Sequence, residues 1–164
     1  MRLSQIKEQI AANTDAIQKL KLEISLLSKD NTRLNNEHDN KLIEYFSEYI
    51  ELGSTYNVSN RYLYFKGVQT GRKKDDKEHR PNFIDGDTFE FIKKNQKSMV
   101  IKCTNKVVLR FNNGVRTKSI ENNPGWTFRV ETESLYTQLM RDPIFKDSYD
   151  KYIIRKEALE LLGI

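Results

Sequence analysis

Few residues of this 164-residue sequence have the types and spacing that covalent catalysis requires. The sequence contains two histidines, His38 and His79, and one cysteine, Cys103. Neither histidine has a Cys or Ser at a spacing typical of a nucleophile and its base. One Cys and two distant His cannot supply the ligands of a zinc site. The sequence therefore predicts no catalytic residues, no metal site and no cofactor.

Carboxylates near the middle of the chain are the other candidates for metal binding. Asp85, Asp87 and Glu90 are close enough in sequence to hold a divalent ion. However, Asp-Gly-Asp before a strand is typical of a turn, and no calcium-loop spacing follows it. Gly67 and Gly71 also lack the Gly-Lys-Ser or Gly-Lys-Thr of a phosphate-binding loop. We interpret residues 85–87 as a turn.

The charge distribution favours binding rather than catalysis. The formal net charge is +5, but residues 61–120 contain fifteen Lys or Arg against six Asp or Glu, a local net of +9 that leaves −4 for the rest. A concentrated positive region is typical of proteins with phosphate-rich or carboxylate-rich partners. Nucleic acid, an acidic protein surface and solvent are the three alternatives for what faces this charge. The candidate nucleic-acid-binding residues are Tyr62, Tyr64, Arg72, Lys73, Lys74, Lys102, Arg110, Arg116 and Lys118.

The N-terminal residues have the heptad spacing of a coiled coil. One row, at the a positions, contains Leu3, Ile10, Ile17, Ile24, Asn31 and His38, and the d row contains Ile6, Asn13, Leu20, Leu27, Leu34 and Lys41. Ile at a with Leu at d favours a parallel two-stranded coil, and a single a-position Asn fixes its register. We therefore expect a parallel homodimer. The predicted contact residues are Ile6, Ile10, Ile17, Leu20, Ile24, Leu27, Asn31 and Leu34.

Other features of this helix leave alternatives open. Leu22 and Leu26 form a second apolar strip, which would allow a trimer, an antiparallel arrangement or docking of a partner helix. After Lys41 the apolar spacing changes phase at Leu42, Phe46, Tyr49 and Ile50. We expect this last section to pack on the globular part of the chain.

The middle of the chain reads as a small antiparallel β-domain. Gly53 to Asn60 has the composition of a connector, Tyr62 to Phe65 reads as a strand, and Thr70 to Asn82 reads as a charged loop. Five further β-like segments are Thr88 to Lys93, Ser98 to Cys103, Val107 to Phe111, Val115 to Ile120 and Trp126 to Glu131. Such a domain could be barrel-like, with five to six strands.

The Asn112-Asn113-Gly114 turn allows the strand register to be predicted. A two-residue turn would place Phe111 opposite Arg116, so we prefer a three-residue loop with Gly114 left-handed, which pairs Phe111 with Val115. This register places Arg110 opposite Arg116, a repelling pair that an anion would relieve. The predicted inner face is Met99, Ile101, Cys103, Val107, Leu109, Phe111 and Val115, and the outer face is Val100, Lys102, Val108, Arg110, Arg116 and Lys118.

Two helices are expected at the C-terminus. The first covers Thr132 to Arg141 with Leu135, Leu139 and Met140 inward, and Asp142-Pro143 ends it. The second covers Ser148 to Leu162, with an inward stripe of Tyr149, Ile153, Leu159 and Leu162. The fold class is therefore α+β, with a coiled-coil domain at 1–52 and a basic β-domain with C-terminal helices at 53–164.

The sequence also bears on location and function. A single cysteine excludes an intrachain disulfide framework, and no apolar run is long enough to span a bilayer or to act as a signal peptide, which predicts a cytoplasmic protein. We expect a non-enzymatic dimer that binds nucleic acid through its basic β-sheet face. The alternative is a protein-interaction module, an inhibitor or assembly factor, that binds a partner through the coil or an acidic partner through the basic face. The Lys- and Asn-rich composition is compatible with a viral protein.

Overall fold

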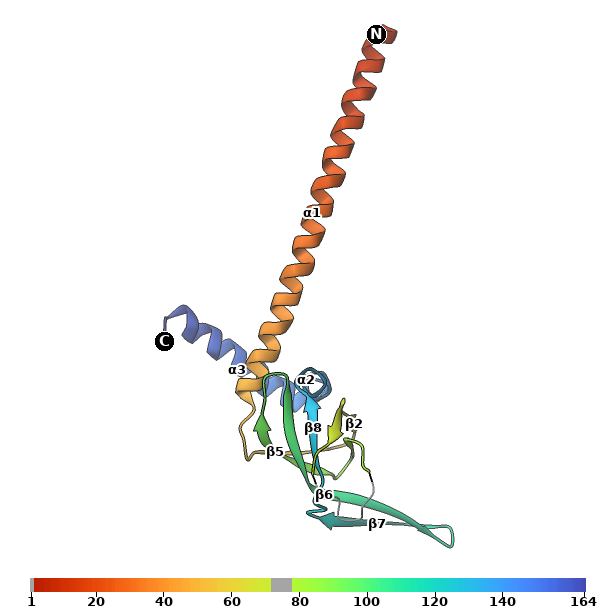
Figure 1. Ribbon diagram of the computed structural model, residues 1–164, viewed down its shortest axis with the longest axis vertical. Coiled ribbons are helices and arrows are strands. Elements are labelled where there is room, and N and C mark those ends of the chain that lie inside the picture. The colour runs from red at the N-terminus through yellow and green to blue at the C-terminus, as the bar shows by residue number, and fades with distance from the viewer. Residues whose placement is uncertain (1, 72–77) are drawn as a thin grey trace. The chain divides into compact units, whose positions relative to one another are not determined.

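The chain has an α+β fold with a long N-terminal helix, antiparallel sheets and two C-terminal helices (Figure 1). The computed structural model describes residues 2–71 and 78–164. The helices are α1 (Leu3–Tyr49), α2 (Thr132–Leu139) and α3 (Pro143–Leu161). The strands are β1 (Thr55–Asn57), β2 (Tyr62–Tyr64), β3 (Gly67–Gln69), β4 (Asn82–Ile84), β5 (Thr88–Lys94), β6 (Ser98–Asn112), β7 (Val115–Asn122) and β8 (Thr127–Glu131). The predicted fold class is confirmed.

The strands form one larger and one smaller sheet. The larger sheet has the order β1-β5-β6-β8-β3, with β7 paired to β6, and β2 pairs with β4 in the smaller sheet. All of these pairings are antiparallel. Strands β1 and β3 lie at opposite edges of the order, so the larger sheet is open and the expected barrel-like closure is wrong.

The chain divides into two compact units, one ending at Leu42 and the other beginning at Ile43. In the first unit, α1 has no Gly or Pro, and Arg33 forms ion pairs with Asp30 at 2.7 Å and Glu37 at 2.8 Å. Such exposed pairs one helical turn apart each stabilise a helix by only about 0.2–0.5 kcal/mol. The predicted contact residues, from Ile6 to Leu34, are all exposed in the single chain.

The last turns of α1 belong to the second unit and enter its core. Tyr45 and Phe46 are buried. The Phe46 ring lies 5.4 Å from the Tyr136 ring and 6.0 Å from the Tyr149 ring, both in edge-on contact. The predicted change of packing after Lys41 is therefore confirmed.

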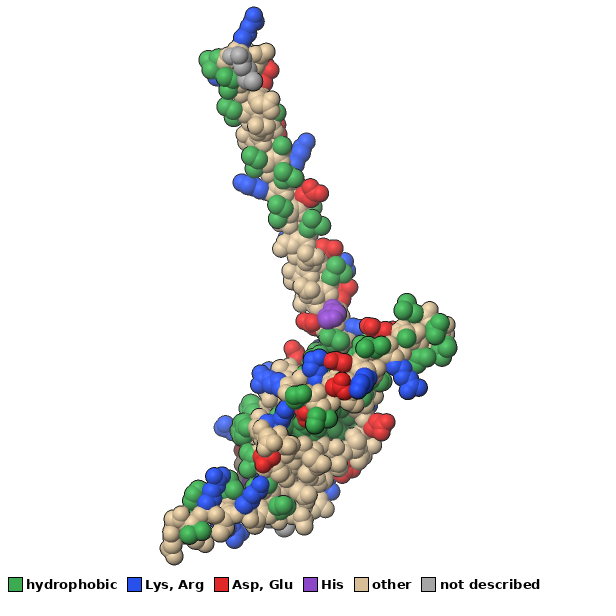
Figure 2. Space-filling model, turned by 180° about the vertical axis from the view of Figure 1, so that it is seen from behind, with side chains coloured by type: hydrophobic (Ala, Val, Ile, Leu, Met, Phe, Trp, Pro, Cys, Tyr) green, Lys and Arg blue, Asp and Glu red, His purple; other side chains and the backbone are tan. Residues whose placement is uncertain are grey.

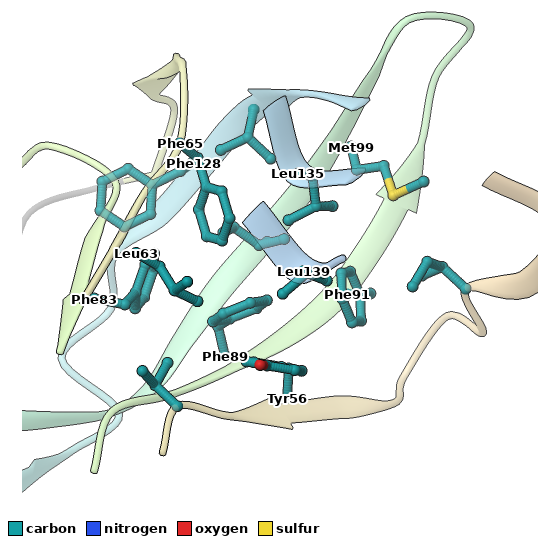
Figure 3. Packing of buried hydrophobic residues seen from close by; sticks show 14 of the residues in the cluster. Tyr56, Leu63, Phe65, Phe83, Phe89, Phe91, Met99, Phe128, Leu135 and Leu139 are labelled. Carbon is teal, nitrogen blue, oxygen red and sulfur yellow. The ribbon is translucent and has the colours of Figure 1, made fainter. Parts of the chain in front are cut away.

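Aromatic side chains dominate the core of the second unit (Figure 3). Phe89 on β5 is fully buried, with ring centroids 4.9 Å from Phe83, 5.4 Å from Tyr56, 5.5 Å from Phe91 and 5.6 Å from Phe65. Each fully buried Phe contributes about 1.5–3 kcal/mol by burial, and each aromatic pair adds about 0.5–1.5 kcal/mol. This cluster joins the two sheets into one unit.

The C-terminal helices lie close to their predicted positions. Leu135 and Leu139 on α2 are fully buried, as predicted. Helix α3 begins at Pro143 rather than Ser148, because the Asp142 carboxylate accepts hydrogen bonds from the backbone N–H groups of the first turn. Burial opposes ionisation of Asp142, but its hydrogen bonds, including one from Tyr56, hold its pKa below the usual value.

The predicted inward stripe of α3 is only partly correct. Tyr149 is buried and Ile153 packs against the core, whereas Leu159 and Leu162 are exposed. The C-terminal end of α3 therefore keeps apolar side chains exposed, although Glu160 accepts a hydrogen bond from the Tyr45 hydroxyl at 2.7 Å.

Candidate nucleic-acid interface

Strands β6 and β7 continue past the rest of the sheet as a two-stranded ribbon, residues 105–122 (Figure 1). On β6, pairing with β8 ends at Lys102 and pairing with β5 ends at Asn105, whereas pairing with β7 runs from Asn105 to Asn112. The predicted separate strands at 98–103 and 107–111 are thus one strand. At about 3.3 Å per residue, the eight paired residues of β6 make the ribbon about 26 Å long.

A two-residue turn closes the ribbon. Asn113 and Gly114 have φ values of 49° and 77°, so both are left-handed, and Asn112 pairs with Val115. This is the pattern of a type I′ turn, whose twist matches that of the flanking strands. The left-handed conformation of Gly114 is confirmed, but the preferred three-residue loop and its register are wrong.

The corrected register changes which side chains share a face. Leu109 lies opposite Lys118, and Phe111 lies opposite Arg116, whose guanidinium is 5.9 Å from the Phe111 ring centroid. The predicted register assumed that the apolar side chains of this strand are buried, so that charged side chains could not lie opposite them. Instead Leu109 is 37%, Phe111 70% and Val115 61% exposed. Their assignment to an inner, buried face is wrong.

The two arginines of the ribbon do not face each other. Arg110 pairs with Thr117, so its side chain lies on the face opposite to that of Arg116. The predicted repulsion across the strands is therefore absent from this pair. The cations are instead divided between two faces, with Arg116 and Lys118 on one and Arg110 on the other.

A buried carboxylate secures the base of the ribbon. Asp87, fully buried, accepts hydrogen bonds from the backbone N–H of Val107 at 2.7 Å and of Ile84 at 2.8 Å. The Lys106 ammonium lies 2.5 Å from Oδ2, the same oxygen that accepts from Ile84, and it also donates to the Asn82 carbonyl at 3.0 Å. Because these partners come from β4 and β6, Asp87 joins the ribbon to the smaller sheet. The predicted turn at 85–87 is confirmed by the hydrogen bond from Asp87 N to Ile84 O, 2.9 Å.

A groove of about 480 Å³ lies on the face of the ribbon that carries Arg116 and Lys118. We call it the ribbon groove. It is lined by Arg61, Tyr62, Ile84, Asp85, Val107, Leu109, Arg116 and Lys118. The lining thus combines an apolar surface with three cations and one carboxylate.

The ribbon has an excess of unpaired positive charge. Residues 105–122 include four cations, Lys106, Arg110, Arg116 and Lys118, and one carboxylate, Glu121. Lys106 is paired with Asp87, but in the described part of the chain none of the other three forms an ion pair. Figure 2 shows Lys and Arg side chains beside hydrophobic ones over the ribbon. A surface of this kind attracts anions with apolar parts.

The remaining predicted site residues are placed differently. Tyr62 and Tyr64 are both exposed on one face of β2, as predicted, but only Tyr62 lines the ribbon groove. Lys102 lies within the larger sheet, between Glu90 of β5 and Thr127 of β8, rather than on the ribbon. Arg72, Lys73 and Lys74 lie outside the described residues.

Arg61 is a groove residue that the sequence interpretation missed. Its guanidinium donates to the Arg141 carbonyl at 3.2 Å, and its Nε is buried without a hydrogen-bond partner among the described residues. Arg61 directly precedes the strand that carries Tyr62, which is the only sequence signal for it. The spacing of residues in the sequence could not identify Ile84 and Val107 as groove residues, because β4 and β6 come together only in the folded chain.

Cys103 and His79 have side chains of types that can be reactive, but both take part in packing. Cys103 is fully buried, and burial raises the pKa of its thiol to about 12. His79 stacks on Trp126, with ring centroids 3.7 Å apart. Across residues 2–71 and 78–164, no three His, Cys, Asp or Glu side chains are grouped so that they could hold a metal ion.

None of the described helices has both the length and the apolar character that a membrane crossing requires. Comparisons of the chain with protein-family models, with curated proteins and with solved structures give no match.

Proposed function

We propose that this chain is a non-enzymatic nucleic-acid-binding protein whose β6–β7 ribbon contacts the phosphate backbone. The observation that carries the proposal is the charge of Arg110, Arg116 and Lys118, none of which forms an ion pair in the described part of the chain, on a ribbon with one carboxylate, Glu121. Phosphate contacts of Lys and Arg supply most of the affinity of nucleic-acid-binding proteins. A two-stranded ribbon also fits the major groove of a duplex, which is about 12 Å wide.

The proposal includes dimerisation through the N-terminal helix. The seven apolar contact residues from Ile6 to Leu34 are between 40% and 65% exposed in the single chain, and heptad spacing would allow a second copy to cover them. Two linked ribbons would bind one nucleic acid with higher affinity than two separate ribbons, through effective concentration.

Light scattering of the full chain tests the dimer. We expect a dimer for the wild type and a monomer for Ile17→Ser with Leu20→Ser, which removes two contact residues. Leu22→Ser with Leu26→Ser is the matched control, because it removes two equally exposed leucines outside the heptad rows. A monomeric wild type at tens of micromolar would contradict the dimer.

An acidic protein partner is the second candidate. The exposure of Phe111 at 70% and Val115 at 61% favours it, because apolar side chains are typical of the centre of a protein interface. The exposed Ile and Leu side chains of the N-terminal helix would offer such a partner a second apolar surface. Phosphate binding weakens steeply with salt, whereas binding through apolar area does not.

A salt titration of labelled single-stranded and duplex DNA tests the proposal. About three phosphate contacts per protomer would give a slope of log affinity against log salt near −5 for a dimer on duplex DNA. Arg110→Ala with Arg116→Ala should flatten that slope by up to about four. Lys146→Ala with Lys151→Ala, which removes two cations of α3 paired with Asp150 and Asp147, should leave it nearly unchanged. A dimeric wild type that binds neither DNA at low salt would contradict the proposal.

A further inference from the structure

We propose that the ribbon groove holds one unpaired nucleobase of a single strand, stacked on Tyr62, with the neighbouring phosphates on Arg116 and Lys118. This inference rests on the proposed nucleic-acid binding. It adds that the bound nucleic acid is single-stranded and that one of its bases lies in the groove. A nucleic-acid strand and a free nucleotide share the chemistry that this groove would recognise, which is a nucleobase that carries a phosphate.

The size and lining of the groove fit such a ligand. Its volume of about 480 Å³ lies within the range of about 300–1,000 Å³ that is typical of small-molecule sites. Ile84, Val107 and Leu109 supply an apolar surface, and Tyr62 supplies an aromatic ring that is 60% exposed. An aromatic ring of this kind stacks with any base, because every base has a flat π-face.

The charges of the groove favour an anion. Arg61, Arg116 and Lys118 contribute three positive charges and Asp85 one negative charge, so the lining has a net charge of +3 − 1 = +2. The Asp85 carboxylate already accepts a hydrogen bond from the backbone N–H of Asn60 at 2.7 Å. Arg61 also lies 4.0 Å from the Asp142 carboxylate, which is not part of the lining, so Arg116 and Lys118 are the two groove cations without an ion pair in the described part of the chain.

Arg61 lines the groove but is held by groups outside its lining. Its Nη2 donates a hydrogen bond to the Arg141 carbonyl at 3.2 Å and lies 4.0 Å from the Asp142 carboxylate, and its Nε is shielded from solvent. Arg61 therefore forms part of the groove wall, and Arg116 and Lys118 are the cations that contact the phosphates in this proposal.

The exposed Tyr62 ring in the groove favours an unpaired base over a base within a duplex. In a duplex the faces of each base are covered by its stacked neighbours, so a base must leave the stack before it can lie against Tyr62. In a single strand that cost is small. The opposite face of the ribbon, which carries Arg110, has cations but does not line the groove, and it serves as an internal comparison.

The test compares matched variants of the full chain on a labelled oligothymidine strand and on a duplex of the same length. Tyr62→Leu should weaken single-strand binding about tenfold, the loss expected for one stacked base, and should change duplex binding less than twofold. Tyr64→Leu is the control, since Tyr64 is exposed on the same face of β2 and does not line the groove. Arg116→Ala should weaken single-strand binding more than Arg110→Ala does. Thermal unfolding verifies that each variant folds.

The outcomes separate this inference from the proposed function. Equal losses for Tyr62→Leu and Tyr64→Leu, or equal losses on strand and duplex, would overturn the groove site while salt-dependent binding stands. A wild type that binds neither DNA would overturn both. Thymidine monophosphate should displace the strand only weakly, because it lacks the neighbouring phosphates. Displacement by this mononucleotide as effective as by unlabelled strand would mean that the groove takes a free nucleotide, and would overturn the strand assignment.

Discussion

The two halves of strand β6 have the same alternation of apolar and polar residues but different surroundings. In the first half, Met99, Ile101 and Cys103 are all fully buried, and β5 and β8 pair with this half of the strand. In the second half, Leu109 and Phe111 follow the same spacing yet are 37% and 70% exposed, and only β7 pairs there. Alternation therefore predicts a strand, but it does not predict whether another layer covers the apolar face.

The two halves meet at an irregularity in the sheet. Thr88 and Phe89 are adjacent on β5 but pair with Asn105 and Cys103, so Thr104 is an extra residue on β6. A bulge of this kind bends the strand and increases its twist. It separates the structural half of β6 from the half that forms the proposed interface.

The largest expected effect is at the junction between these halves. Asp87→Ala should lower the free energy of unfolding by about 4 kcal/mol, because it leaves the Lys106 ammonium and two backbone N–H groups without their acceptor. Urea denaturation measures this change. Asp85→Ala is the control in the same turn and should cost less than about 1 kcal/mol, since Asp85 is exposed. Equal effects at both positions would mean that Asp87 does not anchor the ribbon.

The next largest effect compares the halves directly. Ile101→Ala should destabilise the protein by about 3 kcal/mol, because it removes buried methyl groups and leaves a cavity in the core. Phe111→Ala removes a larger side chain but should change stability by less than about 0.5 kcal/mol, because Phe111 is mostly exposed. The same urea experiment measures both. A Phe111→Ala variant as unstable as Ile101→Ala would contradict the exposed position of the ribbon.

A smaller, local effect is expected at the turn. Gly114→Val should destabilise the ribbon by somewhat more than about 1 kcal/mol, because a β-branched residue is strained at a φ of 77°. Hydrogen exchange of the amides in residues 105–122 measures this local opening. Asn112→Val, at the neighbouring strand position, is the control and should not accelerate exchange. Unchanged exchange in Gly114→Val would exclude the type I′ turn.

The smallest expected effect is one of reactivity rather than stability. Burial raises the pKa of the Cys103 thiol to about 12, so at pH 8 it is both inaccessible and protonated. The native wild type should therefore not react with a thiol reagent at pH 8 until it unfolds. Ser119→Cys, which places a thiol on the exposed ribbon, should react with one equivalent. Rapid labelling of the wild type would show that the first half of β6 is not buried.

Periodicity predicted much of the fold because it reports local structure and burial within one element. It located α1, the packing of Phe46 after the phase change at Lys41, and the inward leucines of α2. It missed β1, β3 and β4, each of three residues, because strands so short carry little alternation. The equally short β2 was predicted only because Tyr62 to Phe65 form a run of aromatic and apolar residues. The pairing of the three missed strands depends on contacts distant in sequence.

The candidate site was predicted in its residue types but not in its geometry. Tyr62, Arg116 and Lys118 were chosen for charge and exposure, and all three line the ribbon groove. Their grouping could not be predicted, because the register was derived on the assumption that Leu109 and Phe111 are buried. The contribution of Arg61 also required the tertiary structure, since β2 and β6 meet only in the folded chain.

The most direct test of the central claim is to locate bound nucleic acid on the protein. A single strand that contains 4-thiothymidine is photocrosslinked to the full chain at low salt, and mass spectrometry identifies the modified peptides. The account predicts crosslinks at Tyr62 and within residues 105–122. It also predicts that these crosslinks are lost in the double variant that carries Arg116→Ala and Lys118→Ala. Crosslinks confined to residues 2–42 or to α3, with none on the ribbon, would contradict it.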